Sequence, residues 1–220
     1  MNKIFIFGAS EHAKYTIDII EQEQKHEISG IFDDNLPKST GFEGYNVLGK
    51  IESLPEAVAR TGIRKGIVAI GDNYTRLRVF QRIMELVPDF EFVSAIHPSV
   101  ILGKNVKIGD GTLIMAGVVI NNDTRLGRHT FIGTQTSIDH DSVLEDFASF
   151  SPGCTTGGAV HVGYCSAICL KAGIIHGVHI GSHTVVGAGS VVTRSLGDHL
   201  VAYGIPARKI RDRQEGEPYL

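Results

Sequence analysis

The pattern of apolar and polar positions changes character near residue 97. Residues 1–96 alternate short, continuous apolar runs with stretches in which apolar residues recur at helical spacing. Apolar runs that end in Gly or Asp predict buried strands, and the 3.6-residue period predicts amphipathic helices. The predicted strands cover 3–8, 27–34, 65–73 and 90–97, and the predicted helices cover 10–24, 51–60 and 75–87. Such alternation predicts a parallel sheet covered by helices.

From Val100 to Ser195 the sequence instead repeats every six residues, without an insertion. The third place of the sixteen hexads is Leu, Ile, Val or Phe in fifteen of them, and only Thr156 departs. A six-residue period is typical of a parallel β-helix. We expect each hexad to form a short strand and a bend, with its third residue pointing inward. Three hexads would then make one triangular coil, so this block predicts roughly five coils.

Composition and charge exclude several classes of protein. The chain has 220 residues, is 42% apolar and 20% charged, and has a formal net charge of −3. Without a Lys/Arg-rich run, nucleic-acid binding is not expected. The apolar run near the N-terminus is too short for a signal peptide or a membrane span. The three cysteines (Cys154, Cys165 and Cys169) are odd in number and lack CxxC spacing, which favours buried thiols in a reducing cytoplasm.

One polar triplet, Asp139-His140-Asp141, interrupts the hexads. His140 stands two places after the inward Ile138, so we expect it near a bend that can reach solvent or a neighbouring subunit. An imidazole is largely neutral at pH 7 and can act as a general base, and a carboxylate can orient it. Asp141 is the first choice for that partner and Asp139 the second. The alternative is a solvated bend with two capping carboxylates.

Three motifs in a fixed order carry a resemblance to a known family. They are GASEHAK at 8–14, the triplet DHD at 139–141 and GIPARKI at 204–210. Together with the hexads they resemble the sugar O- and N-acetyltransferases of the hexapeptide-repeat family. This branch comprises sialic-acid O-acetyltransferase-like proteins and N-acetyltransferases of nucleotide-linked 4-amino sugars. The resemblance implies a Rossmann-like nucleotide-sugar-binding domain at 1–96, a left-handed β-helix acetyltransferase domain at 97–195, and a C-terminal tail at 196–220.

The resemblance also implies an activity. We expect a cytoplasmic homotrimer that transfers acetyl from acetyl-CoA to the amino group of a UDP- or dTDP-linked 4-amino-deoxy sugar. The amine would attack the thioester directly, with His140 as general base and Asp141 as its partner. Two alternatives stay open: O-acetylation of a sialic-acid-type sugar, and a non-catalytic β-helix scaffold. The spacing of histidines such as His161, His176 and His179 does not resemble that of zinc-binding β-helices, so no metal is expected.

The resemblance implies two ligand sites, and at each site one residue differs from the residue that is usual in the family. Positions that match the acetyl-donor site are Ser149, Gly158, Leu170 and Ala188. Positions that match the nucleotide-sugar site are Gly8, Ser10, His12, Asp33, Asp34 and Gly71. Ser149 stands where relatives often have a second histidine, and Glu11 replaces a usual glycine. The loop also lacks the second and third glycines of a dinucleotide fingerprint, so NAD is not expected.

Overall fold

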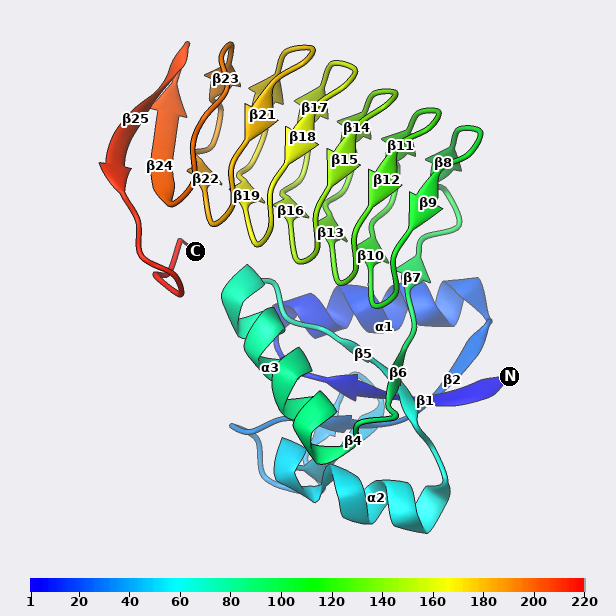
Figure 1. Ribbon diagram of the computed structural model, residues 1–220. Helices are drawn as coiled ribbons and strands as arrows, with labels where there is room; N and C mark the ends of the chain where they lie inside the picture. Colours follow the sequence, from blue (N-terminus) through cyan, green and yellow to red (C-terminus); the bar gives the residue numbers. More distant parts are fainter. Residues whose placement is uncertain (220) are drawn as a thin grey trace.

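The computed structural model describes residues 1–219. A small α/β unit lies beneath a prism whose coils are stacked side by side from β8 to β23 (Figure 1). The α/β unit has a six-stranded sheet in the order β3-β4-β2-β1-β5-β6, in which only the β3–β4 pair is antiparallel. Its elements are β1 (Asn2–Phe7), α1 (Glu11–Glu23), β2 (His26–Phe32), β3 (Gly41–Phe42), β4 (Tyr45–Gly49), the 3₁₀ turn η1 (Ile51–Ser53), α2 (Leu54–Thr61), β5 (Lys65–Val68), α3 (Asn73–Leu86) and β6 (Glu91–Phe92). The predicted parallel sheet with helices is confirmed.

Two details of this sheet differ from the expectation. The hairpin of β3 and β4 was not predicted, because its strands are short and only partly buried. The predicted strand 90–97 is in fact two strands that belong to different sheets. Its first part, β6, pairs with β5, whereas β7 (Ala95–Ile96) pairs with β10 of the prism. The β-helical pairing therefore begins at Ala95.

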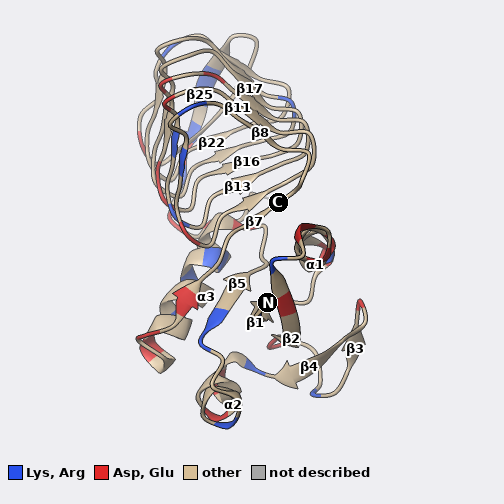
Figure 2. Cartoon of the chain, turned by 90° about the vertical axis from the view of Figure 1, so that its right-hand side faces the viewer, with Lys and Arg blue, Asp and Glu red and all other residues tan. Residues whose placement is uncertain are grey.

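Side-chain alternation along β1 divides the core of the α/β unit into two layers. Ile4 and Ile6 pack with α1 on one face, whereas Phe5 and Phe7 pack with α2 and α3 on the other. Figure 2 shows α1 and α3 on opposite sides of the sheet. Burying such a side chain contributes about 1.5–3 kcal/mol relative to leaving it exposed. The two apolar faces therefore hold the helices on both sides of β1.

The prism is a parallel β-helix, as the hexads predicted, and it is left-handed, as the resemblance implied. Pairing joins residues 18 apart, as in Val119 with Ser137 and Ser137 with Thr155. Each strand from β8 to β23 consists of the second and third residues of one hexad. These strands are β8 (Ile101–Leu102), β9 (Lys107–Ile108), β10 (Leu113–Ile114), β11 (Val119–Ile120), β12 (Arg125–Leu126), β13 (Phe131–Ile132), β14 (Ser137–Ile138), β15 (Val143–Leu144), β16 (Ser149–Phe150), β17 (Thr155–Thr156), β18 (His161–Val162), β19 (Ala167–Ile168), β20 (Gly173–Ile174), β21 (His179–Ile180), β22 (Val185–Val186) and β23 (Val191–Val192).

Third-place residues fill the interior of the prism. From Ile114 to Val192 the aliphatic and aromatic third-place side chains form one continuous buried cluster. The exception, Thr156, uses its hydroxyl to accept a hydrogen bond from the Asp139 backbone N–H at 3.0 Å. The one polar third-place residue therefore supports the first residue of the triplet.

The C-terminal segment continues one face of the prism. β24 (Leu200–Gly204) adds to β22 in parallel, and β25 (Ala207–Asp212) pairs with β24 in the antiparallel sense. The chain then turns back and descends toward the beginning of α3 (Figure 1). Within residues 1–219, no helix is long and apolar enough to cross a membrane.

Candidate active site

The triplet lies at a bend of the β-helix directly after β14. His140 Nδ1 is 2.7 Å from Asp141 Oδ2, and Asp141 has a left-handed backbone conformation with φ of 56°. Asp139 turns away from the ring: its Oδ1 accepts from Asn121 Nδ2 at 2.8 Å and from the His140 backbone N–H at 2.9 Å. Asp141 is therefore the carboxylate at the ring nitrogen, and Asp139 braces the bend.

The same contacts set the protonation behaviour of the triplet. The hydrogen bond that Asp141 accepts from the ring, with a smaller contribution from the charge of Asp139, raises the pKa of His140 above its ordinary value. The hydrogen bond from Asn121 lowers the pKa of Asp139. Because Asp141 occupies Nδ1, the other ring nitrogen, Nε2, is the one available to exchange a proton with a substrate.

Gly158 lies directly against the His140 ring, one coil further along the prism. A Cβ added to Gly158 would stand 2.5 Å from His140 Nε2 and 2.6 Å from Cε1, closer than real Cβ contacts. The absence of a side chain at Gly158 therefore permits the observed position of the imidazole. Gly158 was predicted as a donor-site residue, and the structure places it beside the base.

Other histidines of the β-helix do not gather into a metal site. His161 and His179 stack with ring centroids 4.5 Å apart, and His161 Nε2 is 2.7 Å from Glu145 Oε1. Across residues 1–219 there is no group of three or more His, Cys, Asp or Glu side chains that could hold a metal ion.

The predicted nucleotide-sugar residues lie at the carboxyl ends of β1, β2 and β5. Gly8 has a φ of 110°, a conformation that side chains rarely adopt, and it begins the loop after β1. Asp33 holds this loop: its Oδ2 accepts from the Ala9 N–H at 2.8 Å. Asp34 Oδ1 accepts from the Ile51 N–H at 3.0 Å. Open α/β sheets bind ligands at this edge, and Ser10 is exposed there.

His12 and Gly71 meet inside the junction between the α/β unit and the β-helix. A Cβ on Gly71 would lie 3.3 Å from His12 Nδ1, and the His12 ring is 4.6 Å from the Phe131 ring, edge to face. Burial, with a smaller effect of the Arg76 charge, lowers the pKa of His12 to about 3. The half-buried His12 imidazole is therefore neutral near pH 7, and it packs against Phe131 at the carboxyl edge of the sheet.

Leu170 and Ala188 line one pocket of about 390 Å³ on the face that contains β19 and β22. This pocket also includes Pro218 and Tyr219 from the C-terminal segment. Leu170 and Ala188 are at bends that follow β19 and β22, whereas His140 is at the bend after β14, in a different sheet. The sheet β23-β20-β17-β14-β11-β8 forms the face between these two edges, so one chain brings Gly158 to its own base but not Leu170 and Ala188.

Sequence reasoning missed a buried polar cluster at the domain junction. Arg76, only 2% exposed, donates to the carbonyls of Ile70, Gly71, His129 and Phe147 and to Asn73 Oδ1 and Ser149 Oγ. Ser149 is 4% exposed, and its hydroxyl donates to Asn73 Oδ1. The hydroxyl predicted to contact the acetyl donor is thus engaged within the chain. The one sequence signal for this cluster is Arg76 itself, an arginine in the first turn of α3.

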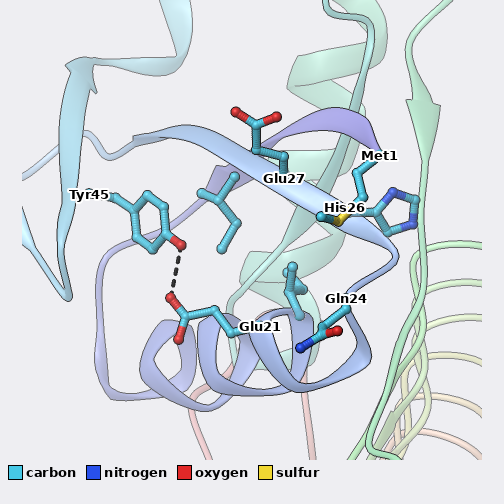
Figure 3. Close-up of a pocket in the computed structure, with 8 residues that line it drawn as sticks. Met1, Glu21, Gln24, His26, Glu27 and Tyr45 are labelled. Atoms are coloured by element: carbon cyan, nitrogen blue, oxygen red, sulfur yellow. Dashed lines mark hydrogen bonds between the residues drawn. The ribbon is translucent and has the colours of Figure 1, made fainter.

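A second pocket, of about 380 Å³, lies far from the triplet. Figure 3 shows it between α1 and the beginning of β2, with Tyr45 donating to Glu21 Oε1 at 2.8 Å. Met1 and His26 line the same pocket. These residues are at the amino ends of the strands, opposite the edge where parallel sheets bind ligands. We therefore do not assign it to the sugar nucleotide.

Known proteins resemble this chain over both parts. Residues 3–83 match the family described as PglD N-terminal domain. GDP-perosamine N-acetyltransferase of Escherichia coli O157:H7 is 29% identical over 73% of this chain and 72% of that protein. A histidine-to-alanine mutant of GDP-perosamine N-acetyltransferase from Caulobacter crescentus, in complex with CoA and GDP-perosamine, has a TM-score of 0.90 and 33% identity and covers 96% of this chain and 98% of its own. The acetyltransferase domain of PglB from Neisseria gonorrhoeae, in complex with acetyl coenzyme A, has a TM-score of 0.85 and 25% identity, covering 96% and 100%.

Proposed function

Because this chain belongs to the hexapeptide-repeat sugar N-acetyltransferases that act on nucleotide-linked amino sugars, we propose that His140 is the general base of acetyl transfer. The reaction moves acetyl from acetyl-CoA to the amino group of a nucleotide-linked sugar. The geometry that supports this role is the 2.7 Å contact of His140 Nδ1 with Asp141, which leaves Nε2 over Gly158.

In this mechanism the sugar amine attacks the thioester carbonyl directly. As the C–N bond forms, His140 Nε2 takes the proton that the nitrogen loses, and Asp141 stabilises the imidazolium. Collapse of the tetrahedral intermediate breaks the C–S bond, and the imidazolium returns the proton to the departing thiolate. The products are the N-acetylated sugar nucleotide and CoA, and the enzyme is unchanged.

The acceptor that we propose is a GDP-linked amino sugar. The resemblance implied a UDP- or dTDP-linked acceptor, but two of the relatives named above, from Escherichia coli and Caulobacter crescentus, carry GDP-perosamine in their names. We place the nucleotide at the carboxyl edge of the sheet, beside the predicted residues Gly8, Ser10, His12, Asp33, Asp34 and Gly71. Asp33 and Asp34 each spend one or both oxygens on backbone N–H groups, so they shape the loops and still have acceptor capacity for a ligand.

We propose that the donor lies along the pocket of Leu170 and Ala188, and that the working assembly is a homotrimer. The apolar lining suits a pantetheine arm. Because these residues and His140 are on different edges of one prism, a neighbouring copy is needed to bring a base to the bound thioester. Light scattering tests this: a mass near that of one chain, 23.8 kDa, at micromolar concentration would contradict the trimer.

Two further assignments belong to the same proposal. The nucleotide-sugar domain ends before β7, since Ala95 already pairs within the β-helix, and the acetyltransferase domain follows it. Three free thiols, at Cys154, Cys165 and Cys169, support a reducing compartment, and we propose the cytoplasm.

CoA release with acetyl-CoA and a panel of acceptors tests the function. The panel contains GDP-perosamine, UDP- and dTDP-linked 4-amino sugars, and free and CMP-linked sialic acids. We expect the highest kcat/KM with GDP-perosamine. Turnover confined to sialic acids would instead establish O-acetylation, and CoA release with none of them would favour a non-catalytic scaffold.

A further inference from the structure

The segment after β25 connects the far end of the β-helix to the α/β unit. This segment, residues 213–219, is here called the strap. It begins where the Arg213 N–H donates to His199 O at 2.8 Å, and Arg213 Nη1 donates to His183 O at 3.2 Å. It then approaches the first turn of α3, where a Cβ on Gly216 would lie 2.7 Å from the Tyr74 ring. Figure 1 shows this descent from β25 toward α3.

The end of the strap reaches a single atom that links three parts of the molecule. Asn73 Oδ1 accepts from the Tyr219 hydroxyl at 3.0 Å, from Arg76 Nη2 at 3.1 Å and from the Ser149 hydroxyl. Asn73 Nδ2 donates to Ser166 O of the β-helix at 2.9 Å. The amide of Asn73 therefore holds the strap, the beginning of α3 and two coils of the prism in one arrangement.

The strap also forms one wall of the donor pocket. The strap residues Arg213, Pro218 and Tyr219 line it together with Leu170 and Ala188. Arg213 is only 6% exposed, and its Nε–H has no acceptor within residues 1–219. Its Nη1 donates to His183 O at 3.2 Å and its Nη2 donates to Glu217 O, so the guanidinium fixes the strap where it meets the pocket.

We propose that the strap is part of the acyl-donor site and that Tyr219 is the positioning residue that latches it to Asn73. This inference rests on the proposed function, because it takes the pocket of Leu170 and Ala188 as the site of CoA. The apolar wall from the strap buries the arm of the donor, and the Tyr219 hydroxyl holds that wall closed. Asn73 directly follows the Gly71–Asp72 turn, so the latch anchors the donor wall to the domain that carries the sugar nucleotide.

The test compares CoA binding by calorimetry in four full-length or truncated proteins. They are the wild type, Tyr219→Phe, a deletion of residues 213–220, and the control Tyr45→Phe. Tyr45 is a matched control because its hydroxyl also makes one hydrogen bond, to Glu21, but at the opposite edge of the sheet (Figure 3). Losing one neutral hydrogen bond should raise the CoA Kd of Tyr219→Phe by about 2- to 13-fold. The deletion should raise it further, and Tyr45→Phe should match the wild type.

Thermal unfolding separates this role from a purely structural one. A strap that only stabilises the fold would lower the Tm of Tyr219→Phe and leave its CoA Kd within about twofold of the wild type, and that result would overturn the proposal. Failure of the wild type to bind CoA would overturn the assignment of the donor pocket as well. Because the wild-type measurement stands alone, the two failures can be told apart.

Discussion

Replacing Gly158 by Ala should disable the base without unfolding the protein. The new methyl group would meet the His140 ring at 2.5 Å from Nε2, 2.6 Å from Cε1 and 3.1 Å from Cδ2. Ordinary contacts of a Cβ lie at 3.4 Å or more, so the ring must move by about 1 Å. The His140 side chain is 52% exposed, which lets it rotate outward rather than distort the coil.

This movement of the His140 ring should lower kcat. The ring cannot shift by that amount and keep the 2.7 Å contact of Nδ1 with Asp141, so both the position and the orientation of the base are lost. A displacement of about 1 Å at a reacting group costs on the order of 10²-fold in rate. We therefore expect kcat of Gly158→Ala to fall by about 10²-fold, with a Tm close to that of the wild type.

The assay is CoA release at saturating acetyl-CoA and GDP-perosamine, with Tm measured on the same preparations. Gly173→Ala is the matched control, because Gly173 is also in the β-helix and its added Cβ would find only Thr155 Oγ1, at 3.7 Å. A kcat of Gly158→Ala within about threefold of Gly173→Ala would refute the reasoning, since it would mean that the ring position seen here does not matter to the reaction.

Three other predictions concern the same machinery. His140→Ala should lower kcat by about 10²–10⁴-fold, with both KM values little changed and CoA release as the readout, and a loss below threefold would remove His140 as base. The carboxylate neighbours raise the pKa of His140, so kcat/KM should fall as the pH drops through that raised pKa. Asp141→Asn should move the acid limb of the pH profile to lower pH. An acid limb that does not move would contradict the role of Asp141. Asp33→Ala should raise the KM of the sugar nucleotide by about 10- to 150-fold while the KM of acetyl-CoA stays constant, and a rise confined to acetyl-CoA would reverse the assignment of the two domains.

The hexad register is the part of this protein that the sequence determined most completely. An inward side chain every six residues is a local requirement, because each coil must bury its own third-place residues against those above and below. The position of His140 at a bend followed from the same register. The register did not distinguish Asp141 from Asp139 as partner of the ring, and the 2.7 Å contact with Nδ1 is what favours Asp141. The parallel sheet likewise followed from alternating apolar runs.

Only the tertiary structure decided how the two parts join. The family match predicted that Ser149 contacts the acetyl donor. In the structure its hydroxyl instead donates a hydrogen bond to Asn73, which is 76 residues away in the chain. No sequence pattern assigned a role to Tyr219. Its hydrogen bond to Asn73, 146 residues away in the chain, is visible only in the structure. Such contacts depend on how helices and strands pack against one another. A buried polar group forms hydrogen bonds with the partners that this packing places nearby. Neither period nor propensity along the chain carries this information.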